Sequence, residues 1–68
     1  MKIAIIGATG FVGAALVNEF TIRNHSVTAI ARNPKDETKQ NVTWAKADVL
    51  EVDALAEILK GHDAIVSA

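Results

Sequence analysis

The stretch IAIIGATGFVGAALV, Ile3–Val17, joins a short apolar segment to a glycine-rich turn and then to a second apolar segment. Its three glycines, Gly7, Gly10 and Gly13, follow one another at three-residue intervals. This pattern predicts a strand, a turn and the start of a helix, whose first N–H groups have no intrahelical partner. Because these groups and the helix dipole both favour negative charge, the turn is a candidate diphosphate site. The alternative is a purely structural turn, since glycines also mark plain turns.

The three glycines have different predicted roles. Gly7, at the end of the strand, can adopt backbone angles that are closed to residues with a Cβ. At Gly10 the missing side chain would let a phosphate oxygen come up against the main chain. At Gly13 it would let the helix pack closely on its strand.

Composition limits the class of protein. The chain has 68 residues, a net charge of −1 and no cysteine. It is therefore at most one small domain, without a basic run for nucleic acid and without a disulfide framework or thiolate metal site. His25 and His62 lie far apart without a ligand cluster, so no metal site is expected. The apolar run before Gly7 is too short for a signal peptide or a membrane span, and we expect a cytoplasmic protein.

The rest of the chain alternates between strand and helix patterns. Strands are expected at Lys2–Ile6, Ser26–Ala31, Val42–Lys46 and Asp63–Ala68, and helices at Phe11 to about Arg23 and Val52 to about Lys60. The polar segment Glu37–Asn41 is either a loop or one helical turn. The expected inward stripes are Val12, Ala15, Leu16 and Phe20 on the first helix, and Leu55, Ile58 and Leu59 on the second. Gly61 stands where a helix C-cap glycine belongs.

This order of elements predicts an α/β fold with a doubly wound parallel sheet, helices on both faces and strand order 3-2-1-4. The first and fourth strands would be neighbours, and the crevice between their carboxyl ends would be the topological switch point. The apolar fourth strand would leave a bare edge. We therefore expect residues 1–68 to be the N-terminal half of a single domain that continues beyond Ala68.

Three segments together resemble the opening of the atypical short-chain dehydrogenases/reductases: GATGFVGAALV at 7–17, AIARNPKD at 29–36 and KADVLEVDALAEILKGHDAIVSA at 46–68. The closest branch is that of the NAD(P)H-binding, NADH-flavin-reductase-like proteins. The resemblance implies a Rossmann-type fold that binds a nicotinamide dinucleotide. It places the pyrophosphate at Gly7, Thr9, Gly10, Phe11 and Val12, with Gly13 completing the motif. It also places Arg32 at the adenosine ribose, Asp48 and Val49 at the adenine, and Ser67 and Ala68 beneath the nicotinamide-side ribose.

Arg32 bears on the choice of cofactor. A carboxylate at the end of the second strand would bind the ribose 2′-OH, but no acid occurs there before Asp36. A guanidinium can instead bind a 2′-phosphate through two parallel hydrogen bonds, and Lys35 would add charge. NADP(H) is therefore favoured over NAD(H). The alternative is an arginine in a solvated loop.

Asp48 also has two interpretations, since a carboxylate ahead of a helix often serves the start of that helix. Related branches often have Asp-Pro at the helix start, and Glu51-Val52 in this chain predicts a weaker cap. The acidic residues Glu51, Asp53 and Glu57 have no predicted role beyond a solvated helix face.

No catalytic residue is predicted. The wider family commonly uses a tyrosine and a lysine four residues apart, and this chain has no tyrosine. Ser67 has no general base arranged near it. Three functions stay open: an oxidoreductase passing hydride from NADPH to an unknown flavin, quinone or small carbonyl compound; a non-catalytic NADP(H)-binding redox sensor or regulator; and a sugar-nucleotide epimerase or dehydratase.

Overall fold

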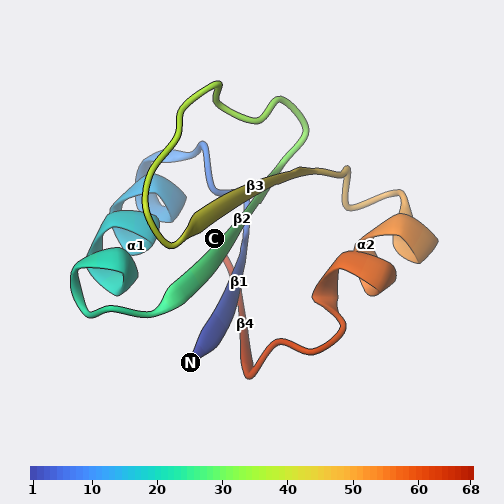
Figure 1. The fold of residues 1–68 in the computed structure, drawn as a ribbon. Coiled ribbons are helices and arrows are strands. Elements are labelled where there is room, and N and C mark those ends of the chain that lie inside the picture. Colours follow the sequence, from blue (N-terminus) through green and yellow to red (C-terminus); the bar gives the residue numbers. More distant parts are fainter.

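The computed structural model describes all residues, 1–68. In chain order its elements are β1 (Lys2–Ile6), α1 (Phe11–Ile22), β2 (Ser26–Ala31), β3 (Val42–Lys46), α2 (Val52–Leu59) and β4 (Ala64–Ser67). The four strands form one parallel sheet in the order β3-β2-β1-β4, which confirms the predicted topology. The two helices cover opposite faces of this sheet (Figure 1).

Each face of the sheet has its own apolar cluster, because successive side chains of a strand point to opposite sides. On the α1 face, the buried residues of the sheet pack with Val17: Ile3, Ile5, Val27 and Ala29. On the α2 face, the buried residues Ala4, Ile30 and Ala47 pack with the half-buried Leu55, Ile58 and Leu59 of α2. The predicted inward stripe of α2 is therefore confirmed. No residue of α2 is fully buried, so this helix is the less tightly packed of the two.

The predicted inward stripe of α1 is wrong in part. Leu16 and Phe20 do pack on the core, but Val12 and Ala15 are exposed. The buried residues of α1 are Gly13 and Val17. The contact face is thus centred about one position further along the helix, because α1 packs closely on the turn at Gly7 and Ala8 through Gly13, which has no side chain.

The ends of several elements differ slightly from prediction. The first helix ends at Ile22, the second at Leu59, and the last strand covers only Ala64–Ser67. Gly61 has φ +78°, as a glycine that follows a helix end should. Segment 37–41 contains no helical turn and is a loop with one antiparallel bridge, between Lys39 and Val42.

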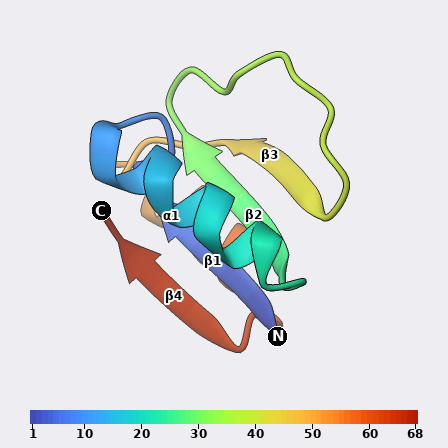
Figure 2. The ribbon, with the colours of Figure 1, turned by 90° about the vertical axis from the view of Figure 1, so that its left-hand side faces the viewer.

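The carboxyl ends of β1, β2 and β4 lie at one end of the sheet, together with the start of α1 and Ala68 (Figure 2). Pairing of Ile6 with Ile30 and of Ile6 with Ser67 brings three segments that are distant in sequence to this edge. None of the helices has the length and apolar character that crossing a bilayer requires.

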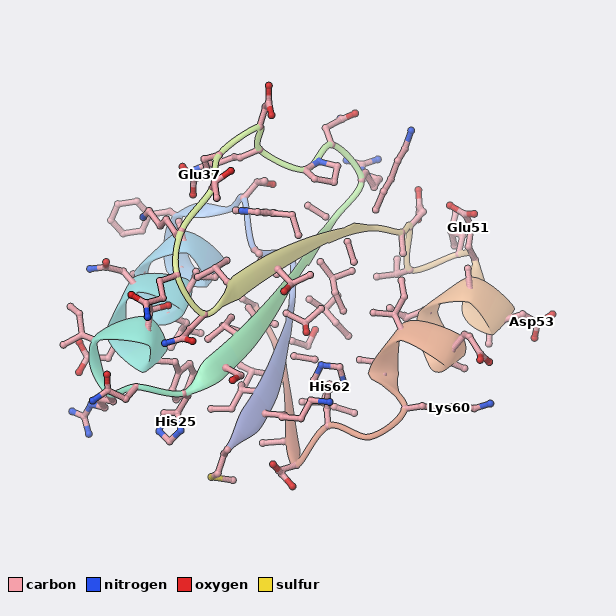
Figure 3. The ribbon with its side chains drawn as sticks, in the orientation of Figure 1. His25, Glu37, Glu51, Asp53, Lys60 and His62 are labelled. Carbon is pink, nitrogen blue, oxygen red and sulfur yellow. The ribbon has the colours of Figure 1, made fainter.

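His62 connects the end of α2 to the sheet, and Figure 3 shows its ring directed toward the strands. Its Nδ1 lies 3.2 Å from the carbonyl oxygen of Leu59, and its Nε2 lies 2.7 Å from Thr28 Oγ1. A carbonyl oxygen can only accept, so Nδ1 carries a proton, and in the neutral ring Nε2 then accepts from the Thr28 hydroxyl. The pair thereby fixes the loosely packed α2 against β2.

Replacing Thr28 by valine is expected to lower the free energy of unfolding by about 1 kcal/mol, because it leaves the half-buried Nε2 of His62 without its donor. In a chain of this size that corresponds to a fall in Tm of about 4–8 °C, measurable by circular dichroism. Thr43→Val is the matched control, since Thr43 pairs with Thr28 in the sheet but is exposed and forms no side-chain hydrogen bond. Equal Tm values for the two variants would contradict the role given to the Thr28–His62 bond.

Candidate functional site

A cleft of about 360 Å³ lies at the carboxyl edge of the sheet. It lies among the carboxyl ends of β1 and β2, the start of α1, and the residues that come after β3 and β4. Its lining consists of Ile6, Gly7, Thr9, Gly10, Ile30, Ala31, Arg32, Asn33, Ala47, Val49, Ser67 and Ala68. The cleft therefore occupies the topological switch point between β1 and β4 that the sequence predicted.

The glycine turn is fixed to the neighbouring strands. The N–H groups of Gly7 and Ala8 both donate to the carbonyl oxygen of Ile30, at 3.0 and 3.1 Å. Gly7 has φ +82°, and a Cβ there would lie 2.8 Å from the carbonyl oxygen of Ala68. The predicted conformational role of Gly7 is confirmed, and the close approach of Ala68 adds a second reason for glycine.

The start of α1 presents free main-chain donors. Gly10 N–H donates to Gly7 and Ala14 N–H to Gly10, both to the carbonyl oxygen. At this end of α1, four N–H groups donate no hydrogen bond within the chain: those of Thr9, Phe11, Val12 and Gly13. Such groups at a helix N-terminus favour an anionic ligand.

A positive side chain lies at the opposite side of the same cleft. Arg32 directly follows β2, is exposed and forms no ion pair. The preceding residue, Ala31, accepts a hydrogen bond of 3.1 Å from Ala47 N–H, which fixes the main chain where Arg32 leaves the sheet. Lys35, expected to add charge beside Arg32, instead lines a separate cavity of about 40 Å³ beside Trp44.

The wall beside Arg32 is apolar. Val49 lines the cleft with 61% of its surface exposed, and the buried Ala47 lies next to it. Asp48 does not line the cleft: its Oδ1 accepts a 3.0 Å hydrogen bond from Leu50 N–H. The carboxylate thus supports the local turn, which agrees more closely with a structural role than with direct contact to a base.

The predicted site residues fall into two groups. Those that line the cleft are Gly7, Thr9, Gly10, Arg32, Val49, Ser67 and Ala68. Phe11, Val12, Gly13 and Asp48 do not line it, although the first three contribute free N–H groups beside it. The side chains of Phe11 and Val12 are exposed to solvent, at 95% and 59%.

The sequence interpretation missed five residues of the lining: Ile6, Ile30, Ala31, Asn33 and Ala47. Each of them lies within two residues of the carboxyl end of a strand. Since parallel strands end at the same edge of a sheet, the predicted strand ends already carried the signal that could have found them.

The chemistry of the cleft can be read from these groups. Free N–H donors and the close approach allowed at Gly10 suit a diphosphate, while Ala31, Ala47 and Val49 offer apolar surface to a flat ring. Arg32 supplies a cation in the same cleft. The residues present therefore fit a dinucleotide, whose anionic centre and aromatic bases require these features.

Comparison with known proteins agrees with this geometry. Residues 7–68 match a family model described as NAD(P)H-binding. The uncharacterized protein YwnB of Bacillus subtilis is 44% identical over 68 residues, which are the whole of this chain and 31% of that protein.

Two solved structures are also similar. One, named a "putative epimerase", from Bacteroides thetaiotaomicron, has a TM-score of 0.89 and 45% identity over 98% of this chain and 32% of its own. The other, named a "putative NADH-flavin reductase", from Streptococcus pneumoniae, has a TM-score of 0.79 and 38% identity over 100% of this chain and 30% of its own. The chain thus spans about a third of the length of these relatives.

Proposed function

The chain belongs to the NAD(P)H-binding family, and from this premise we propose that its cleft binds NADPH in preference to NADH and serves a reductase. The observation that carries the proposal is that the free N–H groups at the start of α1 lie in or directly beside the cleft that the unpaired guanidinium of Arg32 lines. The first suits the pyrophosphate of either cofactor. The second suits the 2′-phosphate that distinguishes NADPH.

The proposed contacts follow the places of the residues in the cleft. Main-chain N–H groups of Thr9, Phe11, Val12 and Gly13 would hold the pyrophosphate, and Gly10 would leave room for it. Arg32 would hold the 2′-phosphate and Val49 would pack on the adenine, with Asp48 beside it. Ser67 and Ala68 would lie under the nicotinamide-side ribose. The lining of the cleft supports the contacts of Thr9, Gly10, Arg32, Val49, Ser67 and Ala68. The free N–H groups of Phe11, Val12 and Gly13 lie beside the cleft, and the place of Asp48 rests on the family resemblance alone.

When bound, the nicotinamide supplies the hydride, and the residues of this chain bind and orient it. The acceptor is proposed to be a flavin, a quinone or a small carbonyl compound. The similarity to a protein named as an NADH-flavin reductase supports this class.

Replacing Arg32 by alanine is expected to weaken NADPH binding by about tenfold or more and to leave NADH binding unchanged, because only NADPH carries the 2′-phosphate. Fluorescence titration of the reduced cofactors on wild type and variant measures both affinities. Arg23→Ala is the matched control, because Arg23 is the only other arginine and pairs with Glu19 on α1, away from the cleft. Equal affinity of the wild type for both cofactors would rule out Arg32 as the selector.

A second candidate is epimerisation or dehydration of a sugar nucleotide on the same bound cofactor, favoured by the similarity to a protein named as an epimerase. The two candidates differ in cofactor balance, since reduction of an acceptor consumes NADPH whereas epimerisation regenerates the cofactor. Loss of NADPH absorbance with a panel of flavins, quinones and aldehydes would support the reductase. Binding without turnover of any of these or of a sugar nucleotide would favour a non-catalytic redox sensor.

A further inference from the structure

The turn between β3 and α2, Asp48–Glu51, is closed by three hydrogen bonds. Leu50 N–H donates to Asp48 Oδ1 at 3.0 Å, and Asp48 N–H donates to Glu51 Oε1 at 3.3 Å. Glu51 N–H donates to the main-chain oxygen of Asp48 at 2.9 Å. Each carboxylate thus accepts a hydrogen bond from the backbone of the turn, and neither of them caps an N–H group of α2. The weaker cap predicted from Glu51-Val52 is confirmed, since the N-cap residue Glu51 makes no side-chain cap hydrogen bond, but no role in the turn was predicted for Glu51.

This turn holds one wall of the cleft. Ala47 and Val49 both line the cleft, and they flank Asp48. Ala47 is already fixed to β2 through its bond to Ala31, whereas Val49 lies inside the turn and is 61% exposed. The packing of α2 adds little restraint, since no residue of this helix is fully buried. The position of Val49 therefore depends on the hydrogen bonds of the turn, two of which are accepted by the carboxylates of Asp48 and Glu51.

We propose that Glu51 is a positioning residue for the adenine-bearing half of a bound dinucleotide. Its carboxylate accepts from Asp48 N–H and so fixes the turn that presents Val49 to the cleft, without contacting the ligand itself. This inference rests on the proposed function, because it takes the Arg32–Val49 side of the cleft as the adenosine side.

Three variants test this inference. Glu51→Gln keeps an oxygen that can accept from Asp48 N–H but removes the charge. Asp53→Ala removes an equal charge from the first turn of α2, where the carboxylate forms no hydrogen bond or ion pair and points away from the fold (Figure 3). Glu51→Ala removes both the charge and the acceptor.

The experiment measures the affinity of the four proteins for NADPH and for adenosine 2′,5′-bisphosphate, at a temperature where circular dichroism shows each to be folded. Glu51→Ala is expected to weaken both ligands by about threefold or more, which is only part of the full effect of a hydrogen bond to a charged acceptor because Glu51 does not contact the ligand. Glu51→Gln and Asp53→Ala are expected to bind both within about twofold of wild type. Exchange of the Asp48 amide proton, followed by NMR, should be faster in Glu51→Ala alone.

Three results would overturn the inference. Unchanged ligand affinity in a folded Glu51→Ala would show that Glu51 only stabilises the fold. A loss of affinity in Glu51→Gln equal to that in Glu51→Ala would show that the charge of Glu51, and not its hydrogen bond, matters. If the wild type binds neither NADPH nor the bisphosphate, the proposed function fails and this inference fails with it. Wild-type binding combined with unchanged binding in Glu51→Ala would leave the proposed function intact.

Discussion

Substituting Gly13 by alanine is expected to destabilise the chain by about 3 kcal/mol or more, at the upper end of the usual cost of overpacking. A Cβ at this position would overlap the carbonyl oxygen of Gly7 and would lie 2.9 Å from its carbonyl carbon and 3.0 Å from Ala8 Cα. All three are backbone atoms of a turn that is fixed to β2 by two hydrogen bonds. The turn cannot yield without breaking those bonds, so α1 must move away from the sheet.

The size of this effect approaches the total stability of the chain. A domain of this length has a free energy of unfolding of about 3–10 kcal/mol. We therefore expect Gly13→Ala to be largely unfolded, or to unfold at a much lower urea concentration than wild type, as followed by circular dichroism. A urea midpoint equal to that of wild type would show that α1 can shift at little cost and would remove the packing role assigned to Gly13.

Substituting Gly10 by alanine is expected to have the opposite profile: the fold is kept and dinucleotide binding is lost. Gly10 has φ −71°, which alanine adopts without strain, and its Cβ would meet only the carbonyl oxygen of Gly7, at 3.4 Å. Yet Gly10 lines the cleft beside the free N–H groups of α1. A methyl group there would keep a phosphate oxygen from those donors.

The expected loss is about tenfold to a hundredfold in affinity for both NADPH and NADH, corresponding to one hydrogen bond to a charged group. Titration of both cofactors and thermal unfolding of the same sample measure the two effects together. Unlike Arg32→Ala, this variant should not discriminate between the cofactors, because both contain the pyrophosphate. Undiminished binding in a folded Gly10→Ala would show that the pyrophosphate does not lie at this turn.

The two glycines illustrate how far sequence reasoning reaches. Their spacing and their place between strand and helix predicted the separate roles of a packing contact at Gly13 and an open approach at Gly10. The structure confirms the packing contact, since Gly13 is buried against the turn. The ligand role of Gly10 stays a prediction, as do the remaining cofactor contacts.

The spacing of apolar residues was not sufficient to predict which face of α1 points inward. The segment 11–17 is almost entirely apolar, so several stripes satisfy helical spacing equally well. The predicted stripe contained Val12 and Ala15, whereas Gly13 and Val17 are the buried residues. A glycine carries no hydrophobic signal, and only the contact with the turn reveals that it faces inward.

Local periodicity predicts the order of elements, and right-handed crossovers predict the parallel sheet. The doubly wound pattern predicts the 3-2-1-4 strand order and a cleft at the strand ends. The tertiary structure decided which side chains face which neighbour. It placed Lys35 beside Trp44, directed the Asp48 carboxylate to Leu50 N–H and gave Glu51 a partner in the Asp48 backbone. Short polar side chains in turns can bond to several nearby backbone groups, and the choice among them depends on backbone angles that the sequence pattern leaves open.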